Sequence, residues 1–133
     1  MIACTSDESG VFEVYLRPYP NTDGGQRKIS TKGGRQAVWS RTGRELYYRD
    51  FGGAIIAVPV TPGERLSLGE PETILPANPG YRGAGAALSA RSYDVSPDGS
   101  RFLMIKPGDA SRPPSIVVVQ NWVEDLRARA FGR

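Results

Sequence analysis

Neighbouring carboxylates are the residues of this sequence with the most obvious capacity for chemistry. They form three pairs: Asp7 with Glu8, Glu70 with Glu72, and Glu124 with Asp125. Acid–base catalysis requires a pocket that separates the pKa values of the two carboxyl groups. Adjacency in sequence supplies no such pocket, so we interpret all three pairs as solvated turn or capping residues.

Histidine does not occur in the chain. A Ser-His-Asp triad, a Cys-His dyad and an imidazole metal site therefore cannot be built within one chain. The single cysteine, Cys4, has no second thiol with which to form a bridge, and we interpret it as a small buried apolar residue. We expect a protein that is not an enzyme, with no catalytic residue, no cofactor and no bound metal.

A glycine-rich stretch around Tyr81 and Arg82 is the best candidate for a ligand-binding loop, with Arg91 as a further positive charge. Glycines let backbone N–H groups approach an anion. A phosphate cradle, however, needs a helix directly after the loop, and none is predicted there. A connecting loop is the favoured interpretation of residues 77–91, and anion binding is the alternative.

Aromatic residues offer a second kind of site, because they could line a ligand channel. Aromatics in strands more often fill the space between packed sheets, and we expect that role here. The residues concerned are Trp39, Tyr47, Tyr48, Phe51, Tyr93 and Trp122. Two acids near them, Asp94 and Asp98, lack the spacing of a calcium loop and are expected to bond to local backbone.

Composition sets the class of protein that must position these residues. The 133 residues are 39% hydrophobic and 23% charged, which is typical of one globular domain. Sixteen glycines and eleven prolines indicate many tight turns, and so an all-β fold. The net charge of +3 is spread along the chain, which argues against nucleic acid as a partner. No apolar run is long enough to span a membrane, and no signal peptide is evident, so the compartment stays open, with the cytoplasm as the default.

Period-two alternation and turn residues predict a succession of short antiparallel strands and one helix. The polar strand 26–30 is expected at a sheet edge. Residues 121–131 have apolar side chains on one helical face and a capping box at Asn121 and Glu124. The helix is expected to pack on the last strands, with docking to a partner as the alternative. The predicted strands are 2–5, 11–17, 26–30, 36–40, 45–50, 54–60, 72–75, 92–96, 101–106 and 115–119.

One turn sequence recurs with a spacing of 56 residues, because Ser40 aligns with Ser96 and Gly43 with Gly99. In the second copy the turn contains Pro97 and Asp98. Proline presets φ at the first central position, and glycine accepts the left-handed conformation. Ser96-Pro97-Asp98-Gly99 is therefore predicted to be a structural turn, and Ser40-Arg41-Thr42-Gly43 a degenerate copy of it.

These turns resemble the repeat of the TolB-like β-propeller family, whose blades carry a serine-proline-aspartate-glycine turn between their first and second strands. Trp39-Ser40, Ser92 to Ser96 and Asn121-Trp122 also look like the end of the propellers that follow some bacterial serine/threonine kinase domains. The resemblance implies four-stranded antiparallel blades in segments of about 1–34, 35–76 and 91–120, within one domain over 1–133. The kinase motifs themselves are absent from the sequence.

About two and a half such blades cannot close a ring, and open strand edges invite pairing with another chain. We therefore expect a non-enzymatic binding or assembly module that associates with itself and can also take a protein or small-molecule ligand. The alternative is a severed sensor or lid domain of a larger enzyme, such as a kinase or a peptidase.

Overall fold

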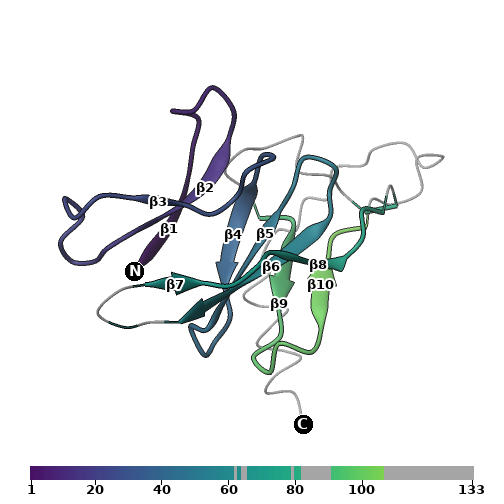
Figure 1. The fold of residues 1–133 in the computed structure, drawn as a ribbon. Coiled ribbons are helices and arrows are strands. Elements are labelled where there is room, and N and C mark those ends of the chain that lie inside the picture. The colour runs from purple at the N-terminus through teal and green to yellow at the C-terminus, as the bar shows by residue number, and fades with distance from the viewer. Residues whose placement is uncertain (62, 64–65, 79, 82–90, 107–133) are drawn as a thin grey trace, which may run out of the picture.

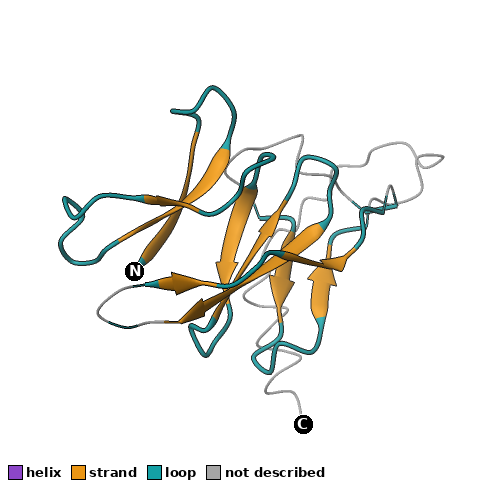
Figure 2. Ribbon diagram, viewed as in Figure 1, coloured by secondary structure: helices purple, strands orange, loops and turns teal. Residues whose placement is uncertain are grey.

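The computed structural model describes residues 1–61, 63, 66–78, 80–81 and 91–106. Within these residues the chain forms ten β-strands and no helix, which confirms the predicted all-β class (Figure 2). The predicted strand 115–119, the predicted helix 121–131, Trp122 and Arg82 lie outside the described residues.

The strands form three antiparallel sheets that follow one another in chain order across Figure 1. The first sheet has the order β1-β2-β3, and the second has the order β4-β5-β6-β7, with β8 also paired to β6. The third sheet is the pair β9 and β10. Their bounds are β1 Ile2–Ser6, β2 Glu13–Arg17, β3 Arg27–Lys28, β4 Arg35–Trp39, β5 Glu45–Arg49, β6 Ile55–Thr61, β7 Ser67–Leu68, β8 Glu72–Leu75, β9 Tyr93–Val95 and β10 Phe102–Met104.

The second sheet is covered on both faces, because alternate residues of its strands enter two different cores. On β5, Leu46 and Tyr48 pack toward the first sheet, whereas Tyr47 packs toward the third. On β6, Ile56 and Val58 take the first direction, and Ile55 takes the second. A strand buried on both faces reads as a continuous apolar run, which explains the uninterrupted sequence from Ala54 to Val58.

Glycines end the hairpins where the turn needs a positive φ. Gly43 and Gly99 have φ of 67° and 73°, and the N–H of each donates to the carbonyl of the serine three residues earlier. Both copies of the repeated sequence therefore form a turn closed by the same backbone hydrogen bond.

Several predicted strands differ from the structure in length. Strand 26–30 shortens to Arg27–Lys28 and lies at the edge of its sheet, as predicted for a polar strand. The short strand β7 was not predicted, because two paired residues leave no pattern in the sequence. Cys4 was predicted to be buried, but its exposure is intermediate, so the structure buries it only in part.

The aromatic prediction is confirmed for Tyr47, Tyr48 and Tyr93, which are buried, and is wrong for Phe51. Phe51 is 46% exposed, and its ring lies beneath the guanidinium of Arg35, 4.4 Å from the ring centroid. The ring follows the turn at the end of β5 and so leaves the sheet face on which it would have packed.

Candidate functional site

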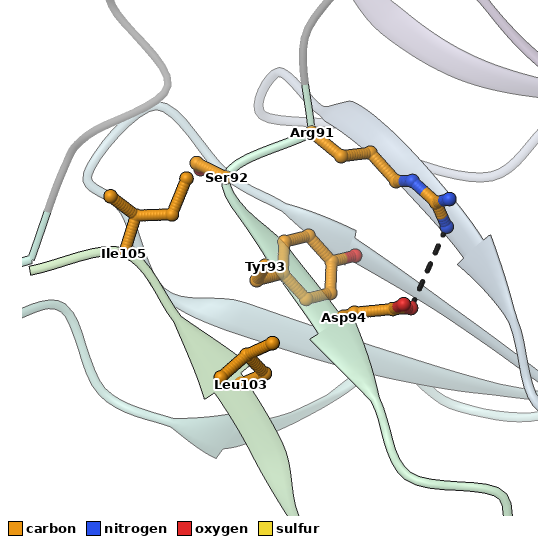
Figure 3. Close-up of a pocket in the computed structure, with 6 residues that line it drawn as sticks. All are labelled: Arg91, Ser92, Tyr93, Asp94, Leu103 and Ile105. Carbon is orange, nitrogen blue, oxygen red and sulfur yellow. Dashed lines mark ion pairs between the residues drawn. The ribbon is translucent and has the colours of Figure 1, made fainter. Parts of the chain in front are cut away.

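An open pocket of about 240 Å³ lies on the third sheet (Figure 3). Three residues at the start of β9, Arg91, Ser92 and Tyr93, form one side of it. Its other lining residues are Asp94, Leu103 and Ile105. Of the three residues predicted for a ligand loop, Arg91 lies here, whereas Tyr81 lies elsewhere, in a turn where its N–H donates to the carbonyl of Asn78.

Arg91 and Asp94 form an ion pair at the rim of this pocket, with 3.6 Å between Nη1 and Oδ1 (Figure 3). Their side chains are 57% and 58% exposed, so water screens the attraction and the pair contributes little to stability. Both charges therefore remain accessible to a binding partner.

A buried polar network supports the pocket from behind. Arg49 is 1% exposed, and its Nη1 donates to Ser92 Oγ at 2.7 Å. The Ser92 hydroxyl in turn donates to Gln36 Oε1 at 2.9 Å. Arg49 Nε also donates to the carbonyl of Gly53 at 3.1 Å. Side chains of β4 and β5 thus fix the start of β9 on the second sheet.

Tyr93 makes a further link between these sheets, because its hydroxyl donates to the carbonyl of Gln36 at 2.8 Å. Burial raises the pKa of Tyr93 strongly, so the phenol stays protonated and remains a donor. Gln36 has a positive φ of 56° and sits in an irregularity of β4 between Arg35 and Val38. This backbone distortion aims the Gln36 carbonyl at the third sheet.

The outer face of the third sheet, formed by Asp94, Leu103 and Ile105, carries exposed apolar surface. Leu103 is 74% exposed and Ile105 is 46% exposed. The other face of the same strands packs inward, since Val95 and Phe102 contact the core shared with the second sheet. Leu103 is paired with Asp94 across the ladder, which places the two on the same face.

The 56-residue repeat shows why this face is unusual. Val38 and Tyr47 of the second sheet align with Asp94 and Leu103 of the third. Val38 and Tyr47 are buried beneath the third sheet, with exposures of 7% and 3%. The equivalent face of the third sheet carries Leu103, which is largely exposed.

The two predicted turns have matching hydrogen bonds and no feature of a reactive site. The backbone N–H of Arg101 donates to Ser96 Oγ at 2.9 Å, and that of Glu45 donates to Ser40 Oγ at 3.1 Å. Asp98 accepts from the N–H of Ser100 at 3.1 Å. Hydrogen bonds from the Ser96 and Ser100 hydroxyls lower the pKa of Asp98 to about 2. These groups hold the hairpins closed.

The described residues hold no cluster of three or more acidic, cysteine or histidine side chains able to bind a metal ion. They also contain no helix of the length and apolarity needed to cross a membrane. The arrangement on the third sheet offers one positive charge, one negative charge and apolar surface.

The sequence did not reveal the Arg49–Ser92–Gln36 network or the exposed face at Leu103. One signal was present, because Arg49 directly follows the apolar residues Leu46, Tyr47 and Tyr48 of its strand. The repeat alignment could also have identified Leu103, since Tyr47 is its partner in the alignment. Comparison with protein-family models, with curated proteins and with solved structures found no match to this chain.

Proposed function

We propose that this chain is a propeller-derived, non-enzymatic module that binds and assembles, and that a second copy covers the outer face of the third sheet. The observation that carries the proposal is the repeated stacking: the face at Val38 and Tyr47 is covered, and its repeat equivalent at Asp94 and Leu103 is exposed. The third sheet covers this face of the second sheet, so a further sheet could cover the equivalent face of the third in the same way.

The blade assignment rests on strand order and on turn placement. Strands β4, β5, β6 and β8 form a four-stranded antiparallel array, the number of strands in a propeller blade. The same serine-to-glycine turn joins β4 to β5 and β9 to β10. The third sheet is then the beginning of another blade.

A second copy suits this face for two reasons. Arg91 and Asp94 carry opposite charges on one surface, so a twofold axis would place each beside its opposite in the other copy, as an isologous interface requires. Among the described residues, β9 and β10 also pair only with each other, and an open strand edge there would favour pairing with a second copy.

The third sheet borders two open pockets, of about 240 Å³ and about 390 Å³, and Asp94 and Leu103 line both of them. A protein partner needs no enclosed cavity, because shape-matched apolar and charged groups suffice.

Light scattering coupled to size-exclusion chromatography tests the proposal. We expect a mass of at least twice the 14.4 kDa of one chain, and a return to 14.4 kDa in Leu103→Glu, which places a charge in the interface. Val11→Glu is the matched control, because Val11 is 47% exposed and lies in the hairpin between β1 and β2. It should leave the assembly unchanged.

A wild-type mass of 14.4 kDa at micromolar concentration would contradict self-association. That result would favour the alternative function, a sensor or lid domain whose exposed face is covered by another part of a larger enzyme. An upstream reading frame that continues into a kinase or peptidase domain would then support it.

A further inference from the structure

Another cavity, of about 360 Å³, lies between the second sheet and the loop 31–33 that joins the first sheet to it, and is separate from the proposed assembly surface. Its volume falls within the range of small-molecule pockets, roughly 300–1,000 Å³. We call it the inter-sheet cavity. It is lined by residues of the loop 31–33, by Asp50 and Pro71, and by one row of side chains on the second sheet.

That row consists of Tyr48, Ile56 and Thr73, which form the floor of the inter-sheet cavity. Tyr48 on β5 pairs with Ile56 on β6, and Ile56 pairs with Thr73 on β8. Directly paired residues place their side chains on the same face of a sheet. The floor therefore presents a phenol, an aliphatic surface and an aliphatic hydroxyl side by side.

The wall of the cavity, Thr31 to Gly33, is held rigidly against the first sheet. The N–H of Gly33 donates to Glu13 Oε2 at 3.0 Å, and Glu13 is 1% exposed. Gly33 has a φ of +86° and contacts the ring of Phe51 so closely that it has no room for a side chain. A preformed wall lowers the entropic cost of binding.

The Tyr48 hydroxyl is the most informative group in the cavity. Tyr48 is only 6% exposed and lines the cavity, yet no described residue forms a hydrogen bond with its hydroxyl. The ring of Tyr48 is buried, whereas its hydroxyl oxygen is accessible in the cavity and so available to a ligand. Burial, reinforced by the negative charges of Glu13 and Asp50, raises the pKa of Tyr48, so the phenol stays protonated and can donate.

The charged groups of the cavity have opposite signs. Asp50 uses Oδ1 to accept from the N–H of Ala54 at 2.8 Å, which orients the carboxylate and leaves Oδ2 as an acceptor. Lys32 also lines the cavity, and no described carboxylate lies within ion-pair distance of it. Hydroxyls of Thr31 and Thr73 add groups that can both donate and accept.

We infer that the inter-sheet cavity binds a neutral polyhydroxylated molecule of monosaccharide size. A carboxylate, an ammonium group and three hydroxyls match a ligand whose own hydroxyls both donate and accept. Ile56 and Pro71 supply apolar surface for the C–H groups of such a ring. The opposite charges of Asp50 and Lys32 leave no excess charge to select an ion. This inference stands independently of the assembly proposed for the third sheet.

Nuclear magnetic resonance titration of the full chain tests the inference, with D-glucose, D-galactose and myo-inositol as probes at up to roughly 50 mM, where even millimolar affinity is detected. We expect at least one probe to shift the backbone amide signals of Lys32, Gly33 and Thr73, while those of β1 and β10 stay unchanged. Saturation should be observed, with one dissociation constant for all shifted signals.

Tyr48→Phe and Thr73→Val each remove one hydroxyl and keep the shape of the side chain. Each should weaken binding roughly 2- to 10-fold, the effect of one lost hydrogen bond. Thr5→Val is the matched control, because Thr5 is exposed on β1, outside the cavity, and it should bind as the wild type does. Unchanged melting temperatures show that the variants fold.

Three outcomes would overturn the inference. The first is the absence of shifts with all three probes. The second is a response to glycine, a zwitterion, that equals or exceeds the response to the sugars, since the paired charges would then be selecting an amino acid. The third is wild-type affinity in both Tyr48→Phe and Thr73→Val.

Discussion

The guanidinium of Arg49 donates a 2.7 Å hydrogen bond to the hydroxyl of Ser92, although 43 positions separate the two residues in the chain. Arg49 belongs to β5 and Ser92 directly precedes β9, so the bond joins the second sheet to the third. Both residues are buried, with exposures of 1% and 5%. A charged hydrogen bond in such a position is strong, and each partner is costly to leave unsatisfied.

Replacing Arg49 with methionine should destabilise the protein by about 1–3 kcal/mol, because the carbonyl of Gly53 loses its donor and Ser92 loses one partner. Methionine fills much of the same volume, so the loss is mainly one of hydrogen bonds. Urea unfolding followed by tryptophan fluorescence measures it. Arg44→Met, at an exposed position on the same hairpin, is the control and should be neutral within error.

If Arg49→Met leaves the unfolding midpoint unchanged, the network does not fix the third sheet on the second. The proposed stacking of blades would then depend on apolar contacts alone, such as the edge-on packing of Tyr47 against Phe102 at 5.5 Å between ring centroids.

The fold class and the hairpins could be predicted from sequence because each depends on neighbouring residues. Alternation along residues 11–17, and the glycines at 43 and 99, are local signals of strand and turn. The polar composition of Arg27–Lys28 likewise placed β3 at an edge. These features can be predicted without knowing which other segments pack against them.

The candidate sites could not be predicted in this way, because each combines distant segments. The inter-sheet cavity joins Lys32 to Thr73, and the network behind the pocket joins Gln36 to Ser92. The bulge that gives Gln36 its positive φ also breaks the strand pattern on which prediction depends. Phe51 was misassigned for a related reason, since its position depends on Arg35 and Gly33 rather than on its own strand.

Gly99→Val should lower stability by roughly 1–3 kcal/mol, because valine is strained at the φ of 73° that the turn requires. Space is not the obstacle, since the nearest atom to an added Cβ is the Tyr47 hydroxyl oxygen at 3.5 Å. Gly99→Asn should cost much less, because asparagine tolerates this conformation. Thermal melting of both variants makes the comparison, and equal losses would contradict the argument from backbone strain.

Alkaline pH should weaken the fold through Tyr47. Burial, together with the hydrogen bond to Glu45 and its charge, raises the pKa of Tyr47 from 10.0 to about 12. Stability that depends on the neutral phenol is complete below pH 10 and is lost as the pH rises toward 12.

Phenolate absorbance isolates this group when the titration of Tyr47→Phe is subtracted from that of the wild type. Glu45→Gln keeps an acceptor near the hydroxyl but removes the charge, so it should lower the pKa of Tyr47. A difference titration centred near the ordinary value of 10.0 in the wild type would show that the phenol is not buried as described.

Gly33→Ala should be more damaging than the same change at Gly10, although both glycines have nearly the same φ, +86° and +87°. A Cβ at position 33 would lie 2.1 Å from Cε2 of Phe51, whereas nothing lies within 4 Å of one at position 10. Because a positive φ strains alanine at both positions, the difference between the two variants mainly reports the clash with the ring. We expect Gly33→Ala to lose at least about 1 kcal/mol more than Gly10→Ala, a typical cost of overpacking, as measured by urea unfolding.

Gly33→Ala should also move the wall of the inter-sheet cavity and weaken sugar binding, which Gly10→Ala should leave intact. Equal unfolding midpoints for the two variants would mean that Phe51 moves aside freely and does not hold the loop 31–33 in place.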